Sequence, residues 1–467
     1  MSITTYASPD LHAYFQSKRA GLDAELTARV VEFIAATETS LDCAIYDLRH
    51  PQILAALTQL ASRAHVRLRI AFDGGGERAG GMAGDPKPSG TAQAIDQAGL
   101  RERATAIHEH GRHLMHDKYL VRDGRAVWVG SANFTVGGLE LQDNNCLEIT
   151  SSALAATYTA AFEELISPGH EHHEQEAGRH AAAQRAAPPA PVAVDGAQFT
   201  PYFAPAAGEG IEQALVEAIR HARRIRVLAF LISDPGVLEA LAPFASNHNF
   251  DIRGVYDPHG MQDVTRASHQ GGHQEHAGRT GKGVHAAQSD ARFWFLHDPR
   301  FIAAPSHGFS AGREQDFMHN KVLVIDDRLV FTGSYNFSEN AEANDETMLA
   351  IESPALAAAY TAYFDALAGA YAHAGAREPV AVGAAAGATH GGAAGDLRRS
   401  AISATDAPGR GAAPAAHHAP ERRATSGAPR SRSGLDGAIA LVVALLVLTA
   451  LALVAFGALT LSGVILH

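Results

Sequence analysis

A motif of six residues occurs twice in this chain of 467 residues, with the same internal spacing in both copies. Each copy has a histidine, a lysine, an aspartate and a Gly-Ser-x-Asn stretch, and the second copy follows the first by 203 residues (319 − 116). Chance rarely reproduces so many identities at fixed spacing, so the chain contains an internal duplication. The copies consist of His116, Lys118, Asp123, Gly130, Ser131 and Asn133, and of His319, Lys321, Asp326, Gly333, Ser334 and Asn336.

Both copies are predicted to form β-hairpins, because apolar runs flank an Asp-Gly pair in the first copy and an Asp-Asp pair in the second. Residues two apart on a strand point to the same side, so the histidine and the lysine of each copy share a face. We expect the returning strand to bring Ser131 opposite His116 and Ser334 opposite His319. The apolar runs are residues 119–121 and 126–129 in the first copy, and 322–325 and 329–331 in the second.

Each hairpin thereby gathers imidazole, ammonium, hydroxyl and amide groups in one patch. Together these groups can attack a phosphodiester and hold its negative charge. Both copies match the signature HxKxxxxD(x)6GSxN, and in this the chain resembles the phospholipase D superfamily. The resemblance implies cleavage or exchange of phosphodiester bonds through a phosphohistidine intermediate, with no metal and no other cofactor.

The duplication extends beyond the motifs, over residues 25–370. A strand, a helix and a second strand precede each motif, and a helix follows it. With the resemblance, this order predicts an α/β fold of two phospholipase D-like sandwich lobes, related by pseudo-two-fold symmetry, with one active site between them. The expected elements are residues 42–46, 51–63, 66–73 and 151–162 in the first half, and residues 225–232, 237–245, 252–257 and 353–364 in the second.

Composition separates the two halves. We assign residues 1–167 to the first lobe, 168–198 to a linker and 199–374 to the second lobe. Clustered His and Glu at residues 170–174 could suggest metal binding. We favour a solvated linker, because the repeat ends before this segment and resumes after it.

The second half contains an insertion at residues 259–316 that is rich in His and Gly. Its place before the second motif predicts a loop near the active site. The aromatic residues 293–295 could enter a membrane, but we favour a core strand that matches residues 104–107 of the first half.

The formal net charge of −12 argues against a sequence-independent nucleic-acid binder, which needs a basic surface. A nuclease with a locally positive site is still compatible with this charge. The chain has only Cys43 and Cys146, and both fall in predicted strands. We therefore expect buried free thiols and no disulfide, which fits a reducing compartment without requiring one.

The C-terminal segment is expected to cross a membrane. Residues 437–466 are almost continuously apolar and uncharged, and they exceed the ~20 residues needed to span a bilayer. We predict a disordered linker at residues 375–434 and a transmembrane tail anchor at residues 435–467. Four arginines precede the anchor, so the positive-inside tendency places the lobes in the cytoplasm. These are Arg422, Arg423, Arg430 and Arg432.

The resemblance implies a role for each motif residue. Lys118 and Lys321 neutralise the phosphoryl charge, while Asp123 and Asp326 support the structure. One histidine attacks phosphorus, and the other protonates the leaving alcohol and then activates water or an acceptor alcohol. Hydrogen bonds to the phosphate are expected from Ser131, Asn133, Ser334 and Asn336.

The two halves differ downstream of the motifs, where superfamily members carry an acidic residue that hydrogen-bonds the histidine of the opposite half. Glu346 holds this position in the second half, whereas Asn144 holds it in the first. By this resemblance Glu346 orients His116 and stabilises its imidazolium. His116 is therefore predicted to be the nucleophile and His319 the general acid and base.

The leading hypothesis is a membrane-anchored phospholipase D-like hydrolase that acts on glycerophospholipids. Phosphatidyl transfer to an alcohol, as in cardiolipin synthases, is an alternative, although those enzymes usually have N-terminal membrane segments. A nuclease of the same superfamily is another, although bacterial examples often have one motif per chain and dimerise. A non-enzymatic scaffold is disfavoured because neither motif is degraded. The predicted partners are a phospholipid membrane and a phosphodiester substrate, with lipid favoured and nucleic acid possible. The active site is expected to require no oligomer.

Overall fold

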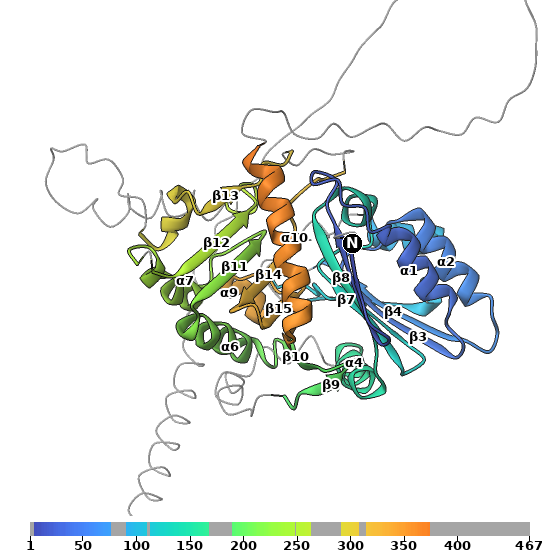
Figure 1. Cartoon of the computed structure of the whole chain (residues 1–467). Helices are drawn as coiled ribbons and strands as arrows, with labels where there is room; N and C mark the ends of the chain where they lie inside the picture. The colour runs from blue at the N-terminus through green and yellow to red at the C-terminus, as the bar shows by residue number, and fades with distance from the viewer. Residues whose placement is uncertain are drawn as a thin grey trace, which may run out of the picture. The chain divides into compact units, whose positions relative to one another are not determined.

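The computed structural model describes residues 4–75, 90–109, 113–167, 189–247, 249–262, 291–307 and 314–373. These residues form two α/β lobes within one compact unit of the chain, Met1–Ala386 (Figure 1). None of the helices in the described part is long and apolar enough to cross a membrane. The predicted linker at 375–434 and tail anchor at 435–467 lie outside the described residues, as does the His/Glu cluster at 170–174.

Each lobe contains an eight-stranded mixed sheet. The first sheet consists of β1 (Thr5–Ala7), β2 (Leu11–Gln16), β3 (Ser40–Ile45), β4 (Arg67–Asp73), β5 (Ala104–Ile107), β6 (Lys118–Arg122), β7 (Ala126–Gly130) and β8 (Asn144–Thr150). The second consists of β9 (Val192–Val194), β10 (Ala197–Ala204), β11 (Arg224–Ala229), β12 (Asp251–Tyr256), β13 (Phe301–Ala303), β14 (Lys321–Ile325), β15 (Leu329–Gly333) and β16 (Glu346–Glu352).

The two sheets have the same strand order. It is β1-β2-β8-β7-β6-β3-β4-β5 in the first sheet and β9-β10-β16-β15-β14-β11-β12-β13 in the second. In each sheet the three strands directly before the motif, β3-β4-β5 and β11-β12-β13, pair in parallel, and the two motif strands pair antiparallel. This identity of topology confirms the predicted duplication.

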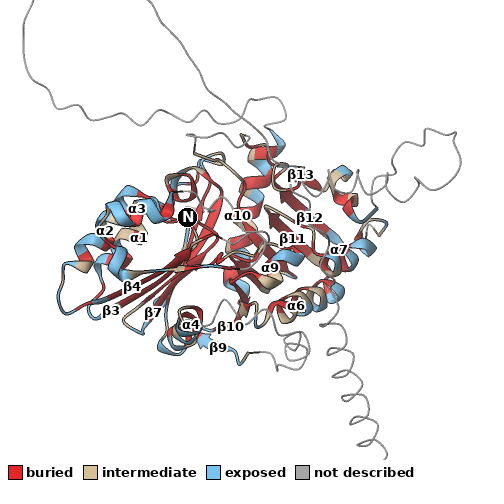
Figure 2. Cartoon of the chain, turned by 180° about the vertical axis from the view of Figure 1, so that it is seen from behind, coloured by how far each residue is buried: buried red, intermediate tan, exposed pale blue. Residues whose placement is uncertain are grey.

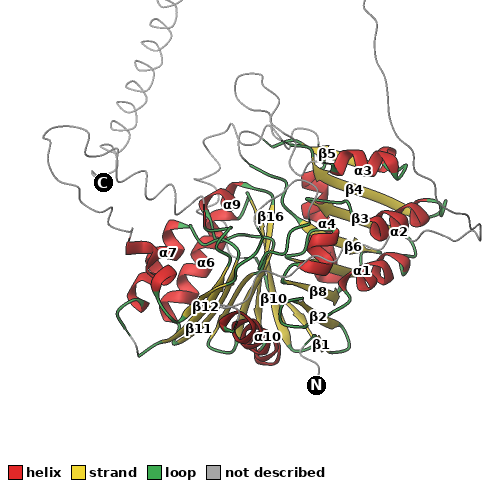
Figure 3. Cartoon of the chain, turned by 90° about the horizontal axis from the view of Figure 1, so that it is seen from above, coloured by secondary structure: helices red, strands yellow, loops and turns green. Residues whose placement is uncertain are grey.

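The helices follow the same repeat. In the first lobe they are α1 (Leu26–Ala35), α2 (Pro51–Ala61), α3 (Thr91–Gln97) and α4 (Ser152–Leu165), and in the second α6 (Gly208–His221), α7 (Pro235–Leu241), α9 (Glu339–Ala343) and α10 (Pro354–Ala372). Helices α1 and α2 lie at one end of the unit, and α6 and α7 lie at the opposite end (Figure 3). Helix α10 lies between the two sheets (Figure 1).

Equivalent capping residues begin the equivalent helices. His50 and Asp234 cap α2 and α7, and each is followed by a proline, whose missing N–H costs nothing at this position. Ser151 and Ser353 cap α4 and α10, and each hydroxyl accepts a backbone hydrogen bond from the first turn. The local sequence therefore sets where these helices start in both lobes.

Aromatic side chains join the two lobes. Phe15 of β2 packs against Tyr360 and Tyr363 of α10, with ring centroids 4.9 Å apart in both pairs. Tyr158 of α4 packs against Phe203 of β10 at 4.9 Å. Buried residues accordingly continue from one lobe into the other (Figure 2), so the lobes share a core and do not merely touch.

Two expectations about segments are wrong. Residues 293–295 belong to a helical turn, η5 (Ala291–His297), in which Phe293 and Phe295 are buried. The strand that pairs with β12, as β5 pairs with β4, is β13. Aromatic residues favour strands only where packing supports a strand, and here a helical turn buries the rings. In addition, β9 and the start of β10 lie within residues 168–198, so the second sheet begins earlier than the predicted boundary.

Both cysteines are free and buried, as expected. Cys43 lies in β3 and Cys146 in β8, two strands of the first sheet. Burial raises the pKa of both thiols, which keeps them protonated and unreactive.

Candidate active site

The two motif histidines lie where the lobes meet, and the backbone of the opposite lobe holds each of them. The His116 N–H donates to the Asp345 carbonyl at 2.9 Å, and the His319 N–H donates to the Asp143 carbonyl at 3.0 Å. Both histidines are buried. Because these bonds cross between lobes, each half completes the site of the other.

The ring of His116 contacts Glu346, as the resemblance implies. Nδ1 of His116 lies 2.8 Å and 2.9 Å from the two carboxylate oxygens. The side-chain amide of Asn344 donates to the same carboxylate at 3.1 Å. When Glu346 is ionised its carboxylate only accepts hydrogen bonds; in that state Nδ1 carries the proton and Nε2 keeps the lone pair that can attack phosphorus.

The ring of His319 contacts neutral groups instead. Its Nδ1 lies 3.1 Å from the Ser131 carbonyl oxygen and 3.2 Å from Oδ1 of Asn144. A carbonyl oxygen accepts only, so Nδ1 is again the protonated nitrogen and Nε2 is the nitrogen left for proton transfer. The asymmetry expected from Glu346 and Asn144 is therefore present as contacts, while the catalytic roles remain predictions.

The two lysines are fixed in the same way in both lobes. Lys118 and Lys321 each donate to the backbone carbonyl of the histidine two residues earlier. Their ammonium groups lie over the rings of Tyr46, at 5.0 Å, and Phe230, at 5.4 Å. Both lysine side chains are buried, so their charges are poorly screened by water.

Burial shifts the protonation of the whole site. Burial, followed by the two ammonium charges, lowers the pKa of His116 and of His319 well below the usual value. Burial also raises the pKa of Glu346 to about 7 and lowers that of Lys118 to about 8, and it lowers the pKa of Lys321 markedly. Burial thus disfavours positive charge at this site, and a phosphoryl anion beside these groups would favour it.

The motif serines have partners within the protein. The Ser131 hydroxyl donates to Oδ1 of Asn144 at 2.7 Å, and the Ser334 hydroxyl accepts from the Thr347 N–H at 2.9 Å. Both serines are buried. Ser131 thus hydrogen-bonds the residue that contacts His319, and Ser334 hydrogen-bonds the residue that follows Glu346. This arrangement favours a positioning role over the predicted contact with phosphate.

The register also departs from expectation. Tyr119 pairs with Val129 across the first hairpin. Continuing this register places Ala132, not Ser131, opposite His116. A shift of one residue moves a side chain to the other face of a strand. The carbonyl of Ser131 instead reaches the histidine of the second motif.

The motif asparagines behave alike in the two lobes. In both Asn133 and Asn336, Oδ1 is buried and has no hydrogen-bond partner. A buried amide oxygen without a partner is uncommon in folded proteins and calls for an explanation. The two equivalent asparagines share this state, but only the amide nitrogen can donate to a phosphate oxygen, so the contact of Asn133 and Asn336 with phosphate stays a prediction.

The motif aspartates lie at the hairpin turns. The Asp123 carboxylate accepts from the backbone N–H groups of Glu38, Thr39 and Ser40. Asp326 accepts from the N–H of Arg223 and of Arg224. Both aspartates have positive φ, 55° and 51°, as tight hairpin turns require. These contacts fit the structural role that the resemblance implies.

Sequence reasoning missed two pairs of residues at the site. Tyr46 and Phe230 follow β3 and β11 and pack against the motif histidines, with ring centroids 4.7 Å and 5.2 Å away. Asp73 ends β4 and Asp257 directly follows β12, and each accepts the N–H of the methionine that precedes a motif histidine. The signal that could have found them is their matching place after equivalent strands in the two halves.

A comparison with protein families fits this geometry. Residues 30–166 and 215–368 match the family model described as "Cardiolipin synthase, PLD-like domain". These segments cover more than half of the chain and include both motifs. The chain belongs to the phospholipase D superfamily. Members of this superfamily act on phosphodiesters.

Three individual proteins illustrate the similarity. The mitochondrial cardiolipin hydrolase of Xenopus tropicalis is 28% identical over 139 residues, which are 30% of this chain and 60% of the hydrolase. The phosphatidylserine synthase of Haemophilus influenzae Rd KW20 shares the fold, with a TM-score of 0.53 and 14% identity over 78% of this chain and 87% of the synthase. Nuc of Salmonella typhimurium, a phospholipase D family member, is 20% identical over 34% of this chain and 94% of Nuc, with a TM-score of 0.26.

Proposed function

We propose that this superfamily member hydrolyses the phosphodiester of glycerophospholipids through a phosphohistidine intermediate. The observation that carries the proposal is the unequal pairing of the histidines, with His116 on the Glu346 carboxylate and His319 on neutral acceptors. A carboxylate stabilises the positive charge that a histidine acquires when it bonds to phosphorus. His116 is therefore the better nucleophile of the two.

The proposed reaction has two steps. Nε2 of His116 attacks phosphorus, the bond from phosphorus to the alcohol oxygen breaks, and protonated His319 gives its proton to that oxygen. Neutral His319 then takes a proton from water as the water oxygen attacks phosphorus and the phosphorus–nitrogen bond breaks. The lysine ammonium groups hold the phosphoryl oxygens throughout, and their charge keeps His319 ready to release its proton.

Several observations support a lipid substrate. The family model names a cardiolipin synthase, and the curated relative is named a cardiolipin hydrolase. The apolar segment at residues 435–467 would place the lobes at a membrane if it is an anchor, which we also propose. Transfer to an alcohol is the second candidate, because the same intermediate reacts with either acceptor and the matched family model is described as a synthase.

One experiment separates these functions. The full chain is incubated with vesicles that contain labelled phosphatidylcholine or cardiolipin, with and without glycerol, and in parallel with single-stranded DNA. Release of the head group supports hydrolysis, and a new diester formed with glycerol supports transfer. Cleavage of the DNA without action on lipid would replace the proposal with a nuclease. A His116→Ala variant must lose whichever activity is found.

A further inference from the structure

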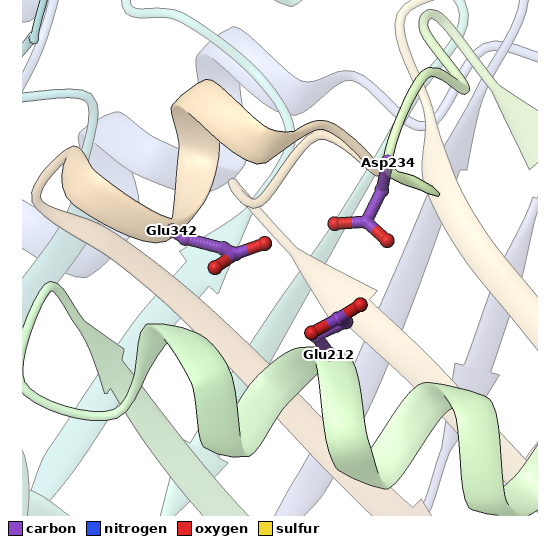
Figure 4. A group of neighbouring side chains, drawn as sticks. All are labelled: Glu212, Asp234 and Glu342. Carbon is purple, nitrogen blue, oxygen red and sulfur yellow. The ribbon is translucent and has the colours of Figure 1, made fainter. Parts of the chain in front are cut away.

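A second group of ionisable side chains lies in the second lobe, apart from the motif residues. Glu212 of α6, Asp234 at the start of α7 and Glu342 of α9 point toward one another (Figure 4). One carboxylate oxygen from each lies within 4.8 Å of the other two. We call these three residues the carboxylate cluster.

The carboxylate cluster has no compensating charge in the described part of the chain, where no lysine, arginine or histidine forms an ion pair with any of its members. Asp234 is fully buried, and its Oδ1 accepts from the Val237 N–H at 2.8 Å. Its Oδ2 is buried, and the Glu212 and Glu342 carboxyl groups beside it can pair with Asp234 only by sharing a proton. Burying carboxylates together without a compensating positive charge is costly, so a missing cation is indicated.

A tyrosine provides a second, independent indication. Tyr335 is fully buried, and its hydroxyl has no hydrogen-bond partner. Tyr335 lies two residues before Phe337, whose carbonyl accepts the Asp234 N–H, so this segment lies next to the carboxylate cluster. A hydroxyl in this segment can donate to a water molecule held by a cation. The equivalent residue of the first motif is Ala132, so this hydroxyl is a feature of the second lobe alone.

The first lobe shows how the same place in the fold is otherwise stabilised. His50 occupies the position of Asp234, since the N–H of His50 donates to the Phe134 carbonyl and that of Asp234 to the Phe337 carbonyl. Phe134 and Phe337 are themselves equivalent, because each follows the last residue of its motif. The backbone frame is thus the same in both lobes.

The side chains in that frame differ in charge. In the first lobe, Nε2 of His50 lies 3.0 Å from the Glu140 carboxylate, and the Thr27 hydroxyl lies 3.3 Å from both. Glu140 therefore has an imidazole and a hydroxyl as donors. In the second lobe, carboxylates occupy all three places, and no imidazole or side-chain hydroxyl hydrogen-bonds to them in the described residues; the donors that reach them are backbone N–H groups, such as that of Val237.

We propose that the carboxylate cluster binds one hard divalent cation of the Ca²⁺ or Mg²⁺ type. Carboxylate oxygens are the ligands these ions prefer, and two oxygens on one Ca²⁺ can be up to about 5 Å apart, so one ion can reach all three side chains. Glu212 and Glu342 are partly exposed, which leaves room for water to complete the coordination. The cation takes the place that the His50 imidazole fills in the first lobe.

The spacing of the three carboxylates supports this site. One oxygen from each lies within 4.8 Å of the other two, so the three groups repel one another when they are ionised. A bound divalent cation removes this repulsion and ties together α6, α7 and α9. Helix α9 leads into β16, which begins with Glu346, so the cation would stabilise the segment that carries this carboxylate.

The test measures cation-dependent thermal stability of the full chain after treatment with a chelator. CaCl2 or MgCl2 is titrated against NaCl of equal ionic strength, and bound metal is counted by elemental analysis. We expect the unfolding temperature to rise by roughly 3 °C at saturating cation, with one ion per chain. A Glu342→Gln variant should lose most of this rise, and the matched first-lobe control Glu140→Gln should keep it.

A transplant makes the test sharper. The double variant Glu212→Thr with Asp234→His installs the first-lobe side chains in the second lobe, and its stability should no longer depend on the cation. If this variant does not fold, Glu342→Gln still decides the matter. The proposal is overturned if the wild type gains no stability beyond the NaCl control. It is equally overturned if Glu342→Gln responds as the wild type does, or if Glu140→Gln loses the response.

Discussion

The two lobes have the same strand order and the same motif, yet they place different side chains, acidic or neutral, at equivalent positions. At the active site the Glu346 carboxylate of the second lobe contacts His116 of the first lobe, whereas the Asn144 amide of the first lobe contacts His319 of the second. Away from the site, His50 and Asp234 occupy equivalent positions with opposite charge character. The duplicated backbone therefore fixes where side chains meet, and a few substitutions decide what each meeting point can do.

The largest expected effect comes from the motif histidines. His116→Gln should reduce turnover by about 10⁴-fold or more, because no covalent intermediate can form. His319→Gln should reduce turnover by about 10²–10⁴-fold, because proton transfer is lost while the nucleophile remains. Rapid quenching at alkaline pH, followed by mass spectrometry, should then find the phosphatidyl group on His116 in the His319→Gln variant. The same group on residue 319 of the His116→Gln variant would reverse the assignment.

The next effect compares the two orienting residues. Hydrogen bonds to charged groups contribute about 1.5–3 kcal/mol and neutral ones about 0.5–1.5 kcal/mol, and each 1.36 kcal/mol is tenfold in rate. Glu346→Gln should therefore lower kcat by about 10–100-fold, and Asn144→Ala by about 3–10-fold. Steady-state kinetics with circular dichroism as a folding control tests this. Equal losses in the two variants would mean that the asymmetry has no catalytic consequence.

The lysines predict a pH dependence. The pKa of Lys118 is lowered to about 8, so its ammonium loses its proton as the pH rises through that value. We expect kcat/KM to fall above pH 8, approaching tenfold per pH unit, because the neutral amine no longer holds the phosphoryl charge. A Lys118→Arg variant keeps its charge and should lose the part of this fall that Lys118 causes, while any part caused by Lys321 remains, whatever the absolute rate. If kcat/KM of that variant falls above pH 8 just as in the wild type, a group other than Lys118 causes the fall.

The smallest effect concerns the turn aspartates. Asp123 accepts from three backbone N–H groups, whereas Asp326 accepts from two. Asp123→Ala should lower the free energy of unfolding by about 2–3 kcal/mol, and Asp326→Ala by about 1–2 kcal/mol. Chemical denaturation monitored by fluorescence measures both, with the exposed Glu32→Ala as a control. A larger loss from Asp326→Ala would contradict this account of the two turns.

Much of the fold could be predicted from local sequence. The helix that begins at Pro51 and the strand that ends at Asp73 lie within two residues of the predicted bounds, because caps, turns and apolar periodicity act over a few residues. The same signals failed at residues 293–295, where the burial of aromatic rings by distant neighbours decided the conformation. The boundary of the second lobe was also missed, because β9 is only three residues long.

The site was predicted in part. Spacing and resemblance identified Glu346 and Asn144, and the structure places each on the histidine of the opposite half. The contacts of Tyr46 and Phe230, and the engagement of the Ser131 hydroxyl by Asn144, were not predicted. The motif pattern does not identify the partners of these three residues, because each partner is far away along the chain and is brought close only by the fold.

The sequence by itself determined the duplication, the family and the residues of the two motifs, since these depend on identity and spacing along the chain. Only the tertiary structure decided which lobe completes which histidine, and that Glu212, Asp234 and Glu342 meet. These three residues span 130 positions (342 − 212) and no local pattern links them. The reason is physical: local propensity sets each element, whereas packing between elements sets the charges that each buried group encounters.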